Sequence, residues 1–130
     1  MMTRKLLIAE DDPASRELLR EILETQGYQV IEVEDGQTAL RRIEEESPDL
    51  VLLDIQMPKL DGLAVVRRLR QNPRLTSLPV IAVTSYAMRR DREKALDAGC
   101  DTYLTKPIDV VAMRKAVEQL LSPVENPTRT

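Results

Sequence analysis

Leu50-Val51-Leu52-Leu53-Asp54 decides the fold, because it is a continuous apolar run that ends in a carboxylate. Four consecutive apolar residues are typical of a central strand in a parallel sheet, which helices cover on both faces. Three further strand-like runs are each followed by polar side chains. They are Leu6–Ala9 before Glu10, Asp11 and Asp12, Val80–Val83 before Thr84, and Tyr103–Thr105 before Lys106.

Strand-like and helix-like segments alternate five times along the chain. The strands are predicted near Lys5–Ala9, Gln29–Val33, Leu50–Leu53, Val80–Val83 and Thr102–Thr105. Apolar residues at helical spacing predict a helix after each strand. The predicted apolar stripes are Leu18, Leu19, Ile22 and Leu23; Ala39, Leu40 and Ile43; Leu63, Val65, Val66 and Leu69; Ala95, Leu96 and Ala98; and Met113, Ala116, Val117, Leu120 and Leu121. This alternation predicts an α/β protein with a doubly wound, five-stranded parallel sheet and five helices.

Composition limits the classes of function. The 130 residues suit one domain, and the net charge of −3 gives no electrostatic reason to expect direct binding to nucleic acid. No apolar stretch approaches the roughly 20 residues that span a bilayer, so we expect a cytoplasmic protein without membrane attachment. The absence of histidine excludes metal sites built on imidazole and a phosphohistidine of the chain's own.

Ligands of such sheets bind beyond the carboxyl ends of the strands, so the polar residues there should converge on one edge. Glu10, Asp11 and Asp54 would repel one another at this edge, and a bound cation would offset the repulsion. Carboxylate and carbonyl oxygens without imidazole suit Mg²⁺, and Mn²⁺ can substitute. A carboxylate beside Mg²⁺ and Lys106 is well placed to accept a phosphoryl group, to which Thr84 can donate a hydrogen bond.

Each of these residues has an ordinary explanation when it is considered alone. Glu10-Asp11-Asp12 can be an acidic helix start, Asp54 a turn residue and Thr84 a helix cap. Lys106 can be a solvated surface charge, and Tyr103 a half-buried residue of the sheet. The combination of acids, hydroxyl and amine at four strand ends favours phosphoryl chemistry over these separate explanations.

The chain resembles the receiver domain of two-component response regulators, of the single-domain type that includes the chemotaxis regulator. The segments that carry this resemblance are Leu6–Asp12, Asp49–Pro58, Asp61-Gly62, Val83–Ser85 and Lys106-Pro107. It implies a flavodoxin-like fold with strand order 2-1-3-4-5. It covers residues 4–121, where we expect the receiver domain. Residues 122–130, which include Pro123 and Pro127, predict a short flexible tail and leave no room for an output domain.

The resemblance implies roles for the residues at the carboxyl ends of the strands. Asp54 is the phosphoacceptor, and Lys106 pairs with the phosphoryl group, with a cis peptide bond between Lys106 and Pro107. Asp11 binds Mg²⁺ directly and Glu10 binds it through water. Asp54 and the main-chain carbonyl of Gln56 complete the protein ligands of the metal.

Further roles concern the response to phosphorylation. Thr84 moves to bond the phosphoryl group, and Tyr103 changes rotamer with it. Together they alter the face made by the fourth helix, the fifth strand and the fifth helix, which contacts a downstream protein. Gln56 and Tyr86 flank the path of attacking water and tune dephosphorylation, with Tyr86 large enough to shield the phosphoryl group.

The implied function is that of a signalling receiver, which assists its own phosphorylation and dephosphorylation but is not an enzyme. A histidine kinase or a histidine phosphotransfer protein would supply the phosphoryl group. One alternative is a phosphorelay intermediate that passes the phosphoryl group onward. Another is a Mg²⁺-dependent phosphatase with an aspartyl nucleophile, but such enzymes carry a second Asp where this chain has Gln56. A third is a receiver-like binding module that is never phosphorylated.

Overall fold

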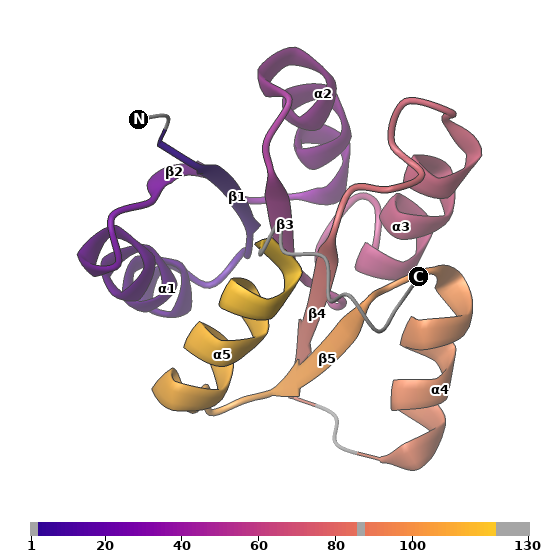
Figure 1. The fold of residues 1–130 in the computed structure, drawn as a ribbon. Coiled ribbons are helices and arrows are strands. Elements are labelled where there is room, and N and C mark those ends of the chain that lie inside the picture. The colour runs from indigo at the N-terminus through magenta and orange to yellow at the C-terminus, as the bar shows by residue number, and fades with distance from the viewer. Residues whose placement is uncertain (1–2, 86–87, 122–130) are drawn as a thin grey trace, which may run out of the picture.

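The computed structural model describes residues 3–85 and 88–121, so Tyr86 and the predicted tail at 122–130 lie outside the described residues. Five parallel strands form one sheet in the order β2-β1-β3-β4-β5 (Figure 1), which confirms the predicted fold class and strand order. The strands are β1 (Lys5–Ala9), β2 (Gln29–Val33), β3 (Leu50–Asp54), β4 (Val80–Thr84) and β5 (Thr102–Thr105). The helices are α1 (Pro13–Thr25), α2 (Gly36–Glu46), α3 (Gly62–Gln71), α4 (Arg89–Ala98) and α5 (Val110–Leu121).

The sheet separates two apolar layers because successive side chains of each strand point to opposite faces. Helices α1 and α5 cover one face, and α2, α3 and α4 cover the other (Figure 1). In the central strand β3, Leu50 and Leu52 pack under α1 and α5, whereas Val51 and Leu53 pack under the other three helices. This two-sided burial explains why β3 is apolar at every position before Asp54.

Aspartates begin four of the helices. Asp12, Asp35, Asp61 and Asp109 each accept a hydrogen bond from a backbone amide in the first turn of α1, α2, α3 and α5, at 3.0, 2.8, 2.9 and 3.1 Å respectively. Such caps satisfy amides that have no partner within the helix. The loop from β1 to α1 comprises only Glu10, Asp11 and Asp12, so the side chains of these residues stay close to the edge of the sheet.

Two residues of the predicted apolar stripes are exposed instead of buried. Leu18 in α1 is 46% exposed and Leu96 in α4 is 40% exposed. Each lies about 100° around its helix from a buried neighbour, Leu19 or Ala95, and that rotation carries it off the buried stripe. Among the residues that the structure describes, no helix has the length and apolar character needed to cross a membrane.

Candidate phosphoryl-acceptor site

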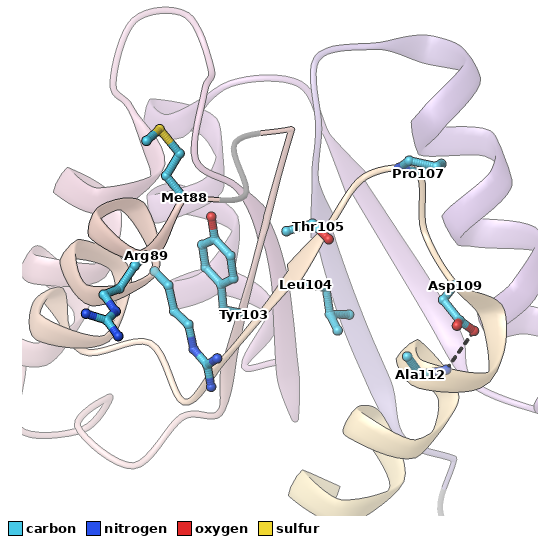
Figure 2. A pocket seen from close by; sticks show the side chains of 9 residues that line it. Met88, Arg89, Tyr103, Leu104, Thr105, Pro107, Asp109 and Ala112 are labelled. Atoms are coloured by element: carbon cyan, nitrogen blue, oxygen red, sulfur yellow. Dashed lines mark hydrogen bonds between the residues drawn. The ribbon is translucent and has the colours of Figure 1, made fainter.

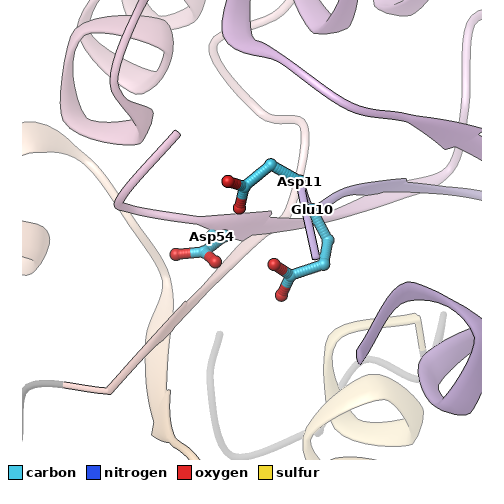
Figure 3. Close-up of side chains that lie close together, drawn as sticks. All are labelled: Glu10, Asp11 and Asp54. Atoms are coloured by element: carbon cyan, nitrogen blue, oxygen red, sulfur yellow. The ribbon is translucent and has the colours of Figure 1, made fainter. Parts of the chain in front are cut away.

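The carboxyl ends of β1 and β3 bring three carboxylates together (Figure 3). The two strands pair in parallel up to Ala9 and Leu53, so the next residues, Glu10 and Asp54, lie at the same edge of the sheet. Asp11 follows Glu10, and one carboxylate oxygen from each of the three residues lies within 4.8 Å of the others. Glu10 and Asp54 are 1% and 4% exposed, whereas Asp11 faces solvent. We call Glu10, Asp11, Asp54 and Lys106 the acidic edge.

Lys106 contacts both buried carboxylates. Its ammonium nitrogen lies 2.8 Å from Glu10 Oε1 and donates a 2.9 Å hydrogen bond to Asp54 Oδ2. The contact with Glu10 is a close ion pair, so one ammonium serves both buried carboxylates. The Lys106 amide donates to the Thr84 carbonyl at 2.8 Å, which holds the loop after β5 against β4. The Lys106-Pro107 peptide bond is cis, as expected.

Burial and crowding of charge change the acidity of this edge. Burial, followed by the neighbouring Asp54 carboxylate, raises the pKa of Glu10 to about 7, against the opposing effect of Lys106. Burial by itself would lower the pKa of Lys106, but the contacts with Glu10 and Asp54 outweigh it and raise that pKa. Three carboxylates therefore lie close together beside one ammonium, which contacts Glu10 and Asp54, and a further cation would lower the free energy of their ionised forms.

The loop after β3 holds Asp54 from the other side. Asp54 Oδ1 accepts a 2.8 Å hydrogen bond from the Gln56 amide, so Asp54 is a turn residue as well as part of the acidic edge. A Cβ atom on Gly62 would lie 2.6 Å from the Asp54 carbonyl oxygen, which restricts this start of α3 to glycine. Both oxygens of the Asp54 carboxylate are thus fixed, one by the Gln56 amide and one by Lys106.

The acidic edge fits a hard divalent cation. Its donors are carboxylate oxygens, and the two buried carboxylates have one ammonium between them. Mg²⁺ in proteins is held by one or two carboxylates together with water, and Mn²⁺ accepts similar ligands. The exposure of Asp11 leaves room for that water.

Thr84 ends β4, the strand beside β3. The register pairs Asp54 with Val83, so Thr84 lies at the same edge one residue further along its strand, and it is 1% exposed. The explanation of Thr84 as a helix cap is wrong, because the cap position of α4 is Met88 and no side chain bonds there. The structure therefore brings Thr84 to the edge that carries Asp54 and Lys106.

The sequence of this chain matches the family model described as "Response regulator receiver domain" over residues 6–118. The chain belongs to this family. A relative named polar-differentiation response regulator DivK, from Brucella ovis, is 38% identical to this receiver, and the alignment covers 92% of this chain and 98% of the relative.

Solved structures resemble the receiver over nearly its whole length. A putative response regulator from Chloroflexus aurantiacus has a TM-score of 0.90 and 30% identity, covering 93% of this chain and 99% of that one. The receiver domain of a sensor histidine kinase from Pseudomonas aeruginosa PAO1 has a TM-score of 0.86 and 32% identity, covering 92% and 98%. The latter structure is described as having a magnesium ion coordinated in its active site cleft.

A groove of about 600 Å³ lies between α4, β5 and the start of α5 in this receiver (Figure 2). The half-buried Tyr103 ring stands between β5 and α4, and burial raises the pKa of its hydroxyl. Thr105 and Pro107, the neighbours of Lys106, form part of the wall. The groove is therefore separate from the three carboxylates but begins beside Lys106. Its lining comprises Met88, Arg89, Arg92, Tyr103, Leu104, Thr105, Pro107, Asp109 and Ala112.

One contact with the acidic edge was not predicted from the sequence. Arg16, in the first turns of α1, donates a 2.9 Å hydrogen bond from its guanidinium to the Glu10 carbonyl oxygen. Helical side chains point toward the N-terminus of their helix, so a long cation four residues after the cap Asp12 can reach back to the preceding loop. That direction, combined with the position of Arg16, is the signal that could have predicted the contact.

Proposed function

We propose that this receiver accepts a phosphoryl group on Asp54 from the phosphohistidine of a histidine kinase or a histidine phosphotransfer protein. Bound Mg²⁺ would assist the transfer, and the phosphorylated receiver would signal through protein contacts. The observation that carries the proposal is the Asp54 carboxylate at the end of β3, beside Lys106 and within 4.8 Å of oxygens from Glu10 and Asp11. Membership of the receiver family supports the same role.

Four residues would hold the metal in this proposal: Asp11 directly, Glu10 through water, Asp54 through its carboxylate and Gln56 through its main-chain carbonyl. When bound, Mg²⁺ would neutralise charge on the phosphoryl oxygens. The crowding of carboxylates and the raised pKa of Glu10 support a cation at this position. The magnesium ion described in the Pseudomonas aeruginosa structure is consistent with it.

The transfer itself requires little covalent chemistry from the protein. A carboxylate oxygen of Asp54 forms a bond to phosphorus while the phosphorus–nitrogen bond of the donor breaks, and the bonding electron pair stays on the histidine nitrogen. The main contribution of the receiver is positioning and electrostatics. Lys106, which contacts the Asp54 carboxylate at 2.9 Å, is placed to pair with the new phosphoryl oxygens.

The response would pass from the acidic edge to the groove. Thr84 donates a hydrogen bond to the phosphoryl group, and Tyr103 changes rotamer with it. The groove then offers a different surface on α4, β5 and α5. Its position beside Lys106, with Tyr103 in its wall, supports this route.

The lining of the groove indicates the chemistry of the downstream partner. Arg89 and Arg92 on α4 supply positive charge, and Met88, which is 71% exposed, adds an apolar surface next to Tyr103. An acidic segment with an apolar side chain is complementary to this combination. Phosphorylated wild-type protein should therefore capture its partner, while Arg89→Glu should be phosphorylated normally and lose the capture.

Gln56 and Tyr86 would set the lifetime of the aspartyl phosphate. Both lie two positions after a residue of the site, Asp54 or Thr84. We expect Tyr86 to slow hydrolysis by shielding the phosphoryl group from water. Loss of the phosphoryl group from Tyr86→Ala at the wild-type rate would show that this side chain does not control the lifetime.

Acetyl phosphate labelling tests the proposed function. With Mg²⁺, intact-protein mass spectrometry should detect one phosphoryl group for each chain, removed by hydroxylamine as expected for an acyl phosphate. Chelation of the metal should prevent labelling. Absence of label with Mg²⁺ would indicate a binding module, whereas steady turnover of a small phosphoester would indicate a phosphatase.

A further inference from the structure

Arg16 links α1 to the backbone of the acidic edge. Its side chain is 16% exposed. One end of the guanidinium donates to the Glu10 carbonyl at 2.9 Å, and Nε lies 3.3 Å from Glu32 Oε1 on β2. Two directed contacts to different elements hold the planar group in one orientation.

The Glu10 carbonyl and the Asp11 amide belong to one planar peptide group. Together with the φ angle of Asp11, the orientation of that plane sets the direction in which the Asp11 side chain leaves the backbone. The Asp11 carboxylate makes no hydrogen bond or ion pair with another described residue. Its position consequently depends on the backbone. The backbone of Glu10 is held on one side by its amide, which donates to the Val33 carbonyl at 3.1 Å, and on the other by Arg16.

We propose that Arg16 is a positioning residue for the metal-binding carboxylates, acting through the Glu10–Asp11 peptide group. This inference rests on the proposed function, because it assumes that the acidic edge binds a divalent cation. Arg16 touches neither a phosphoryl group nor a metal in this role. It holds the loop in the arrangement that brings Asp11 within 4.8 Å of the oxygens of Glu10 and Asp54.

Charge alone does not account for the placement of Arg16. A cation near a metal site weakens metal binding by repulsion. Here Glu32 pairs with Arg16, and it also pairs with Arg20, which in turn lies 3.8 Å from Glu24. The carboxylates of Glu24 and Glu32 therefore neutralise the guanidinium groups of Arg16 and Arg20. The contact between Arg16 and the acidic edge is then chiefly the directional hydrogen bond to the Glu10 carbonyl.

Arg20 provides a matched control. It lies on α1 one turn after Arg16 and bonds the same carboxylate, with its guanidinium 2.9 Å from Glu32 Oε2. It donates no hydrogen bond to Glu10 or Asp11. If Arg16 only fastened α1 to β2, replacing either arginine would have a similar effect on the protein. A positioning role predicts that metal affinity responds to Arg16 alone.

Mn²⁺ binding measured by electron paramagnetic resonance, without any phosphodonor, separates these possibilities. Arg16→Met should weaken Mn²⁺ binding by about tenfold, as expected for loss of a group that orients metal ligands. Arg20→Met should change it by less than about twofold, a change in line with the small effect of exposed ion pairs. Circular dichroism in the same buffer establishes that each variant is folded.

The outcomes are distinct. Wild-type affinity in Arg16→Met, or an equal loss in Arg20→Met, would overturn the positioning role and leave the metal site intact. A wild-type protein that binds no Mn²⁺ would remove the proposed metal site, and this role with it. If Arg16→Met does not fold, Arg16→Lys and Arg20→Lys replace the pair. Lysine lacks the second arm of the guanidinium, so Arg16→Lys should bind several-fold more weakly than Arg20→Lys; equal binding by the two would contradict the role.

Discussion

Acidic and basic residues lie at both ends of the parallel strands, but they are paired differently at the two ends. At the acidic edge, the two buried carboxylates share one ammonium, and the exposed Asp11 lies beside them. At the other edge, where β1 and β4 begin, Asp49 Oδ2 accepts the Lys5 amide at 2.8 Å and Asp101 Oδ2 accepts the Val80 amide at 2.8 Å. We call this second region, made by Lys5, Asp49, Arg70, Val80 and Asp101, the amino edge.

Arg70 completes the amino edge. Its guanidinium donates to the carbonyls of Gly99, Leu75 and Thr76 and to Asp101 Oδ2, at 3.0, 3.0, 3.2 and 3.1 Å. Polar groups there satisfy the backbone, so they contribute to stability. The carboxylates of the acidic edge are held close together with too little positive charge, which costs stability but leaves them available to a ligand. This difference supports a structural role for the amino edge and the proposed functional role of the acidic edge.

The largest expected effect is at the amino edge. Arg70→Met removes four hydrogen bonds and leaves Asp101 without its cation, so the free energy of unfolding should fall by about 3 kcal/mol. Arg74→Met is the control. Its side chain is 79% exposed and pairs with Glu44 at 3.6 Å, so its loss should cost less than about 0.5 kcal/mol. Urea unfolding followed by circular dichroism measures both, and equal effects would contradict a structural role for the amino edge.

A second prediction concerns pH. The pKa of Glu10 is raised to about 7 in the folded protein from 4.5, so between these values the folded state binds the proton that the unfolded state releases. The contribution of Glu10 to the free energy of unfolding of the metal-free protein should therefore be most favourable below about pH 4.5. It should fall by on the order of 3 kcal/mol as the pH rises through 7.

Glu10→Gln should remove this part of the pH dependence. Urea unfolding of the two proteins at pH 5 and pH 8, in the presence of a chelator, gives the comparison. Glu44→Gln, at an exposed position of α2, should retain the wild-type difference between the two pH values. An identical pH dependence in wild type and Glu10→Gln would contradict the proposed crowding of charge at the acidic edge.

The smallest effect should differ in sign between the two edges. Asp54→Asn can keep the hydrogen bond from the Gln56 amide but loses the bond from Lys106, which still pairs with Glu10. Because the repulsion between Asp54 and Glu10 is also removed, we expect the metal-free protein to be stabilised by about 1 kcal/mol at pH 8. Asp101→Asn weakens the bonds to Arg70 and to the Val80 amide, so it should destabilise by about 1 kcal/mol. Denaturant midpoints that move in the same direction would break the contrast between the edges.

Much of this arrangement could be predicted from the sequence. The run Leu50–Leu53 shows that its strand is buried on both faces, and the strand order that followed from the family resemblance agrees with the structure. Convergence of Glu10, Asp54 and Thr84 on one edge follows because parallel strands end at the same edge. The burial of this strand and the convergence of the strand ends depend on the path of the backbone, which the pattern of apolar residues predicts.

The remaining features depend on side chains that meet across the fold. Arg70 contacts Gly99 and Asp101, which are 29 and 31 positions away in the sequence. A local sequence pattern does not predict contacts between residues so far apart. The contact of Lys106 with Glu10 depends on a rotamer rather than on spacing. Leu18 was misplaced because the width of an apolar stripe does not reveal where the neighbouring elements stop covering the helix.

The identity of the phosphorylated residue tests the central claim most directly. Wild-type protein, Asp54→Asn and Asp101→Asn would be incubated with acetyl phosphate and Mg²⁺, and intact-protein mass spectrometry would measure the label on each. The same substitution at the two edges should have opposite outcomes: Asp54→Asn carries no phosphoryl group, and Asp101→Asn is labelled like wild type. A labelled Asp54→Asn protein would contradict the assignment of Asp54 as the phosphoacceptor.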